Sequence, residues 1–196
     1  MFWKGRGRAD AATVIPFDVD RTAVEAAKRD AGAFEPLYRK YVAQIYSLSL
    51  YETRDPHVAE DITEGVFLKA LAALPGFREQ GAGTDSTFKV WLYAIARNVI
   101  SNERRSLRRH PTDPIEAALG LRAPDDPAAT AVTRLEAQRA WDAVMELPLG
   151  RRQAIVLRFV NELSAREIGE VMGKSEGAVR VLIHRALVSV RRRMSA

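Results

Sequence analysis

The sequence of 196 residues contains no cysteine, which excludes disulfides, thiolate metal sites and cysteine nucleophiles. Histidine is scarce, and the three that occur, His57, His110 and His184, lie far apart. None of them falls in a spacing typical of metal ligands. We therefore expect no metal site and no cofactor.

Long apolar runs are also absent, so no segment is expected to insert into a membrane. The N-terminus carries Lys4, Arg6 and Arg8, but the apolar run that follows at 11–15 is too short for the core of a signal peptide. These two absences predict a cytoplasmic protein.

Patterns typical of catalysis are missing as well. No nucleophile–base pair, phosphate-binding glycine loop or pair of carboxylates stands out. Asp55, Asp61 and Asp85 are interpreted as a helix cap, a surface residue and a loop residue. We therefore expect no enzymatic activity from this chain.

The charge of the chain is basic and unevenly distributed, with a formal net charge of +5. Residues 177–193 contain five arginines and no acid, whereas residues 111–138 contain two arginines and five acids. A basic balance permits a polyanionic partner. The segmental distribution favours specific basic surfaces over a diffuse positive charge.

Apolar residues recur at helical spacing through most of the chain, and no strand pattern occurs. The spacing predicts helices over 34–50, 55–74, 88–109, 127–147, 151–160, 164–173 and 176–193, and a short helix over 21–29. Asp20 is the expected cap of the short helix, and Leu135 and Phe159 are expected in the core.

The predicted fold is all-α, with two small helical domains joined by an acidic, proline-containing linker. We expect an irregular N-terminal extension at 1–19, an N-terminal domain at 20–109, the linker at 110–126 and a C-terminal domain at 127–196. The C-terminal domain is expected to contain a helix-turn-helix.

The stretch 88–109 combines an apolar stripe with a basic side. The stripe is formed by Phe88, Trp91, Leu92, Ile95 and Val99. The opposite side is expected to carry Tyr93, Arg97, Asn98, Ser101, Arg104 and Arg105, with Arg108 and Arg109 beyond them. One interpretation is a core helix with a solvated basic face. The other is a nucleic-acid surface, in which cations bind phosphates and rings contact bases.

Residues 163–185 follow the pattern of a helix-turn-helix. Ser164 and Glu167 form a capping box, Gly173 ends the first helix, and Ser175 is a plausible cap for the second. In the second helix the apolar positions face inward, which leaves four residues near its start facing outward: Arg180, Val181, His184 and Arg185. An ordinary helical hairpin is the alternative, but the combined signals favour DNA binding in the major groove.

Three acids on the predicted helix 55–74 face outward: Glu60, Asp61 and Glu64. A solvated helix face and a protein-binding face explain them equally well.

Five segments together resemble the extracytoplasmic-function (ECF) sigma factors of bacterial RNA polymerase. They are AFEPLYRKY at 33–41, DPHVAEDITEGVFLKAL at 55–71, FKVWLYAIARNVISNERR at 88–105, ELPLGRRQAIVLRFV at 146–160 and LSAREIGEVMGKSEGAVRVLIHRAL at 163–187. The resemblance implies a promoter-specificity subunit without catalytic activity of its own. The implied partners are core RNA polymerase, through its β′ clamp and β flap, promoter DNA in duplex and single-stranded form, and an anti-sigma factor.

The resemblance also implies roles for individual residues. Binding and melting of the −10 element would fall to Phe77, Arg78, Trp91, Arg97, Asn98, Ser101, Arg104 and Arg105. Binding of the −35 element would fall to Ser175, Arg180, Val181, His184 and Arg185. Contact with the polymerase clamp would fall to Asp61, Glu64 and Phe67.

Three positions depart from the pattern of the family. Gly65, Val181 and Leu182 stand where the family usually has glutamate, serine and arginine, and Leu182 is expected to pack against the core. A stand-alone helix-turn-helix regulator, whose N-terminal domain senses a signal or dimerises, is the alternative function.

Overall fold

The computed structural model describes residues 19–79, 87–109 and 131–195, and every regular element in these ranges is a helix. This confirms the all-α fold class. The N-terminal unit contains α1 (Val19–Arg29), the 3-10 helix η1 (Ala31–Phe34), α2 (Glu35–Thr53), α3 (Pro56–Ala73), the 3-10 helix η2 (Leu74–Gly76) and α4 (Phe88–Arg109). The C-terminal unit contains α5 (Ala131–Met145), α6 (Leu149–Phe159), α7 (Ala165–Met172) and α8 (Glu176–Met194).

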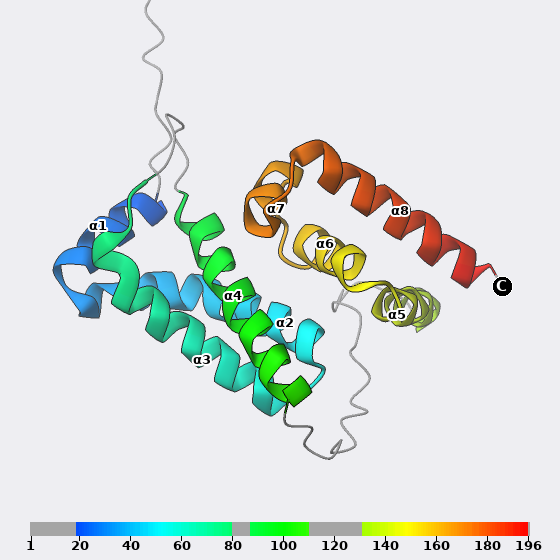
Figure 1. Ribbon diagram of the computed structural model, residues 1–196, viewed down its shortest axis with the longest axis horizontal. Helices are drawn as coiled ribbons and strands as arrows, with labels where there is room; N and C mark the ends of the chain where they lie inside the picture. The colour runs from blue at the N-terminus through cyan, green and yellow to red at the C-terminus, as the bar shows by residue number, and fades with distance from the viewer. Residues whose placement is uncertain (1–18, 80–86, 110–130, 196) are drawn as a thin grey trace, which may run out of the picture.

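Figure 1 shows α2, α3 and α4 packed together. The C-terminal unit lies against them, with α7 packed on α4 and α6 packed on α2. Of the predicted irregular extension at 1–19, residues 1–18 lie outside the described residues, and Val19 is the first residue of α1. The predicted linker at 110–126 also lies outside them. The predicted domain limits therefore stay predictions.

Local capping signals determine where several helices begin. The Asp55 carboxylate accepts hydrogen bonds from the backbone amides of His57 and Val58, so α3 begins at the proline that follows the cap. Ser164 and Glu167 form the predicted capping box of α7. These caps satisfy amide groups that have no partner within their own helices.

The turn between α7 and α8 confirms the predicted helix-turn-helix. Gly173 adopts a left-handed conformation with φ of 65°, which a residue without a side chain tolerates best. The Ser175 hydroxyl then accepts a hydrogen bond from the amide of Ala178 and starts α8. Leu182 is half-buried and packs against the core, as predicted.

Two predictions for the N-terminal unit are wrong. Tyr93 was expected on the solvated side of its helix but is fully buried, because α4 is covered on two sides. Its hydroxyl donates to Gln44 Oε1 at 3.0 Å. Asp20 does not cap α1 but lies in its first turn, where its carboxylate accepts a hydrogen bond from the Tyr41 hydroxyl and pairs with Lys40 Nζ at 2.6 Å.

Two expected core residues of the C-terminal unit are exposed. Leu135 is 55% exposed because it lies about 120° around α5 from the buried Trp141. Phe159 is the last residue of α6 and is 53% exposed. Helical spacing identified both helices but not how far the core extends along each of them.

The helix-turn-helix depends on a close approach at Gly169. A Cβ atom there would lie 2.6 Å from the carbonyl oxygen of Lys174 in the turn. We predict that Gly169→Ala lowers the free energy of unfolding by about 1–3 kcal/mol, because backbone must move to admit the methyl group. Urea unfolding followed by circular dichroism measures the change.

Gly177→Ala is the matched control, because a Cβ at Gly177 meets no atom within 4 Å. This variant should keep or raise the stability by up to about 1 kcal/mol, as expected for alanine in a helix. Equal stabilities of the two variants would contradict the close-packed turn.

Candidate nucleic-acid interface

A cluster of rings anchors the first turn of α4. The Phe88 ring is completely buried, and its centroid lies 5.6–6.4 Å from those of Phe34, Tyr41, Phe77 and Trp91. Aromatic rings bury large areas and favour such tilted and edge-on pairs. The start of α4 is therefore fastened to η1, α2 and the segment after η2.

The α4 face is defined here as Arg97, Asn98, Ser101, Arg104 and Arg105. Four of these residues are exposed, and Arg104 is half-buried. Arg105 Nη1 donates to Asn102 Oδ1 at 3.4 Å. Arg108 and Arg109 belong to the last turn of α4, and their side chains are not among those that the structure describes. The structure thus brings the predicted −10 residues of α4 onto one side of a single rigid helix.

Two arginines of the α4 face already have protein partners. Arg104 Nη1 lies 3.1 Å from Glu52 Oε2, whose side chain is only 1% exposed. Arg97 Nη1 donates to the backbone carbonyl of Val171 in α7 at 3.0 Å. Burial raises the pKa of the Glu52 carboxyl, and the charges of Arg152 and Arg104 act in the opposite direction.

Sequence reasoning missed Glu52, although a signal was present. Its position continues the buried stripe of α2 formed by Tyr41, Ile45 and Leu48. An acid in an apolar stripe indicates either a buried ion pair or a surface at which a partner needs that charge. The structure shows that the arginines of α4 and α6 surround it with positive charge.

The predicted −10 loop meets α4 beside Trp91. Phe77 is 4% exposed and packs against Trp91 with ring centroids 4.9 Å apart. Arg78 is exposed. Glu79 Oε2 accepts hydrogen bonds from the amide and the hydroxyl of Thr87, at 2.7 and 2.9 Å. These bonds tie the two ends of the loop together, whereas residues 80–86 lie outside the described ranges.

The predicted −35 residues lie together on α8. Arg180, Val181, His184 and Arg185 are all exposed, and Val181 is 47% exposed. Arg180 Nη2 pairs with Glu176 Oε1 at 2.5 Å within the helix. An exposed pair of this kind contributes little to stability. The arginine can therefore exchange its carboxylate for a phosphate at small cost.

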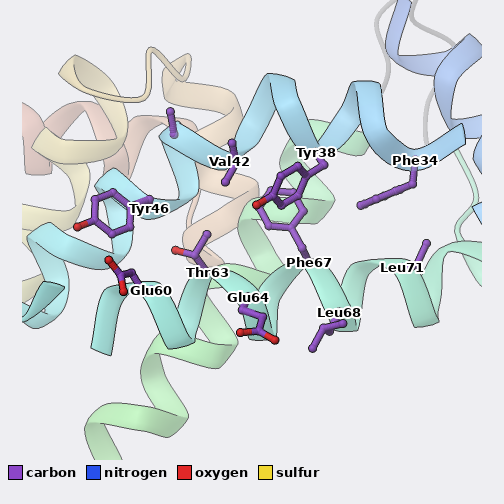
Figure 2. A pocket seen from close by; sticks show the side chains of 11 residues that line it. Phe34, Tyr38, Val42, Tyr46, Glu60, Thr63, Glu64, Phe67, Leu68 and Leu71 are labelled. Carbon is purple, nitrogen blue, oxygen red and sulfur yellow. The ribbon is translucent and has the colours of Figure 1, made fainter. Parts of the chain in front are cut away.

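A groove of about 690 Å³ lies between α2 and α3. Figure 2 shows Tyr38 and Tyr46 reaching it from α2, and Glu60, Glu64 and Leu68 from α3. Its lining is mainly apolar, and Phe67 packs edge-on against Tyr38 with ring centroids 4.8 Å apart. Two predicted clamp residues, Glu64 and Phe67, line the groove.

Asp61, the third predicted clamp residue, is exposed on α3, outside the groove lining. Tyr38 is 43% exposed and Leu68 is 60% exposed, so two large apolar side chains face solvent in this groove. An apolar surface bordered by acids fits a protein partner better than DNA.

Within the described ranges, no three side chains of the types that bind metals lie close enough to hold an ion. None of the helices in those ranges is both long and apolar enough to cross a lipid bilayer.

Comparison with known families matches both units of the chain to one class of protein. Residues 37–110 match the family described as Sigma-70 region 2, and residues 137–190 match Sigma-70, region 4. The chain is 32% identical over 197 residues to the ECF RNA polymerase sigma factor ShbA of Streptomyces griseus, covering 94% of this chain and 97% of ShbA. It is also 32% identical over 167 residues to the ECF RNA polymerase sigma factor BldN of Streptomyces coelicolor, covering 83% of this chain and 61% of BldN.

Solved structures support the same fold. The chain resembles CnrH, solved in complex with the cytosolic domain of CnrY, with a TM-score of 0.65 and 23% identity over 91% of this chain and 98% of CnrH. It also resembles the sigma factor RpoE of Bartonella quintana, solved with the anti-sigma factor NepR, with a TM-score of 0.63 and 20% identity. That match covers 83% of this chain and 97% of RpoE.

The buried ring of Phe77 leads to a prediction about its role. We expect Phe77→Ala to lower the free energy of unfolding by about 3 kcal/mol or more, because it removes a ring from the cluster around Phe88. Asn98→Ala, at an exposed position of α4, should change stability by no more than about 0.5 kcal/mol. Urea unfolding compares the two, and a small effect at Phe77 would show that its ring is not part of the core.

Proposed function

Because the chain belongs to the ECF sigma factor family of bacterial RNA polymerase, we propose that its two helical units divide the promoter between them. The N-terminal unit binds core polymerase and captures the −10 element, and the C-terminal unit binds the −35 element. The observation that carries this proposal is the α4 face, where exposed polar and cationic groups follow directly on the ring cluster at Trp91 and Phe88. Rings that contact bases and cations that bind phosphates are what a single strand requires.

The proposed −10 site has a rigid and a polar part. Phe77 is buried, so its role is to support Trp91, which is half-buried and lies at the edge of the cluster. The polar groups of Arg97, Asn98 and Ser101 bind bases and backbone of the unpaired strand. Arg78, Arg104 and Arg105 supply further positive charge for phosphates.

The proposed −35 site is the outward side of α8. Arg180 and Arg185 bind phosphates or guanine edges, and His184 adds a polar group. Val181 offers only an apolar contact, which suits the methyl group of thymine. Ser175 caps the helix and holds its N-terminus, where backbone amides favour a phosphate.

The proposed polymerase site is the groove between α2 and α3. Tyr38 and Leu68 provide exposed apolar area above the buried ring of Phe67. Glu64 in the groove and Asp61 on α3 outside it provide negative charge for a basic and apolar surface on the β′ clamp. The β flap is proposed as the partner of the C-terminal unit. Since polymerase supplies the catalysis, the chain itself is proposed to have no enzymatic activity and to work in the cytoplasm.

An anti-sigma factor is proposed as a regulatory partner. One structure of similar fold holds the sigma factor RpoE together with the anti-sigma factor NepR, and another holds CnrH together with the cytosolic domain of CnrY. Affinity purification of this chain from its own cells tests the idea, and recovery of polymerase subunits alone would contradict it.

The −10 assignment predicts a defect in melting. The test promoter is obtained by sequencing transcripts made by this chain with core polymerase. The double variant Arg97→Ala, Asn98→Ala should still form closed complexes but should lose open complexes at least about tenfold, a loss of about 1.4 kcal/mol or more. Permanganate footprinting measures melting, and gel shift measures binding. Arg139→Ala, exposed on α5, is the control, and normal footprints in the double variant would refute the assignment.

The −35 assignment predicts a loss of phosphate contacts. Arg180→Ala and Arg185→Ala should each weaken binding to a −35 duplex and lower the slope of log affinity against log salt by about 1. Arg192→Ala, exposed in the last turn of the same helix, should leave the slope unchanged. Equal slopes for all three variants would exclude this face of α8 as the DNA-binding surface.

A further inference from the structure

A buried acid lies next to the α4 face. Glu52 belongs to the last turn of α2, and its side chain is 1% exposed. Its Oε2 atom accepts a hydrogen bond from Nη1 of Arg104 at 3.1 Å. Arg104 lies 52 positions further along the chain, on α4, which packs against α2. The pair therefore joins the proposed −10 site to a second helix of the N-terminal unit.

Two physical effects disfavour an acid at the position of Glu52. Burial disfavours the charged form of a carboxyl group, and it raises the pKa of this one. The C-terminal end of a helix carries partial negative charge, which repels an acid in the last turn. The charges of Arg152 and Arg104 act against these effects, and Arg104 forms the ion pair with the carboxylate. Glu52 is therefore better placed to hold a cation than to stabilise α2 by itself.

Arg104 is held differently from its neighbour Arg105. Arg105 is exposed and bonds to Asn102 on the same helix, whereas Arg104 bonds to a carboxylate of another helix. The Arg104 side chain is 25% exposed, so most of it is fixed among neighbouring atoms. A guanidinium carries five N–H donors in a rigid fork, and the bond to Glu52 uses one of them. This geometry leaves donors of the same fork for a phosphate.

We propose that Glu52 is a positioning residue for promoter DNA, which holds the Arg104 guanidinium in place to bind a phosphate of the −10 strand. The proposal rests on the proposed −10 function of the α4 face. A side chain that is already ordered loses less conformational entropy when it binds. The carboxylate also balances the charge of a guanidinium that is largely removed from water. Without this carboxylate, Arg104 gains by turning out into solvent and loses its fixed position.

Charge attraction alone predicts the opposite outcome when Glu52 is changed. Glu52→Gln removes one negative charge beside a DNA-binding surface, so simple attraction predicts tighter binding of DNA. Positioning predicts weaker binding, because the amide keeps the shape of the side chain but no longer balances the charge of the guanidinium. The direction of the change in affinity therefore separates the two explanations.

The test uses the holoenzyme formed by the full-length chain and core polymerase. Its ligand is a fluorescein-labelled fork of the test promoter, in which the −10 segment of one strand is unpaired. Fluorescence anisotropy gives the dissociation constant at several salt concentrations for Glu52→Gln, Arg104→Ala and the double variant. Glu103→Gln is the matched control, because Glu103 is half-buried on the same helix but is not the acid that pairs with Arg104.

We expect Glu52→Gln to weaken fork binding about fivefold or more, although it adds positive charge to the site. It should also lower the slope of log affinity against log salt by up to about 1, as Arg104→Ala does, because both variants lose the same phosphate contact. In the Arg104→Ala background, Glu52→Gln should weaken binding no further. Glu103→Gln should leave binding unchanged or tighten it.

A second variant keeps the acid at this position. Glu52→Asp retains the carboxylate and should bind the fork more tightly than Glu52→Gln does, although its shorter side chain holds the guanidinium less closely than glutamate. Circular dichroism and co-purification with core polymerase check that each variant is folded and assembled. If Glu52→Gln does not fold, the cycle with Arg104→Ala is measured from Glu52→Asp, with a smaller loss of affinity expected.

Unchanged or tighter binding in Glu52→Gln, together with a loss in Arg104→Ala, would overturn the positioning role and leave the −10 function in place. Equal losses from Glu52→Gln with and without Arg104 would overturn it as well, because Glu52 would then act on the fold alone. Normal binding in Arg104→Ala would also overturn the inference, and the variant Arg97→Ala, Asn98→Ala then shows whether the rest of the −10 site stands.

Discussion

The packing around Phe88 is the interaction on which the N-terminal unit depends. One fully buried ring contacts rings from η1, from α2, from the segment after η2 and from the next turn of α4 itself. Such pairs contribute about 0.5–1.5 kcal/mol each beyond the area they bury. Because the cluster lies at the first turn of α4, it sets the direction of the whole helix. The α4 face is rigid for this reason, although its own side chains are polar and mostly exposed.

The same helix has to satisfy two demands that conflict. Its apolar side packs on α2 and α3, while residues on other sides face either solvent or the C-terminal unit. Tyr93 and Arg97 show the conflict directly, since Tyr93 is buried and Arg97 bonds to a carbonyl of α7. A helix used only for packing would not need cations there. A helix used only for DNA would not hold one of them against another unit.

Local signals were readable from the sequence, and distant contacts were not. The caps at Asp55, Ser164 and Ser175 were predicted because each involves residues at most three positions apart. Tyr93 was placed wrongly and Glu52 was missed because their partners lie 49 and 52 positions away. Helical spacing identifies a stripe but not how many neighbours a helix has. The roles of individual site residues came from the resemblance to a family, and they stay predictions.

The chemistry of the contacts determines which of them can break without unfolding the chain. Within the N-terminal unit the main contacts are between rings and aliphatic side chains, and losing them exposes apolar area to water. Between the units, three of the hydrogen bonds end on backbone carbonyls, at Gln44, Met145 and Val171. Water can replace each of these bonds at a net cost of about 0.5–1.5 kcal/mol. Each of these three bonds is therefore cheaper to break than the apolar packing within either unit.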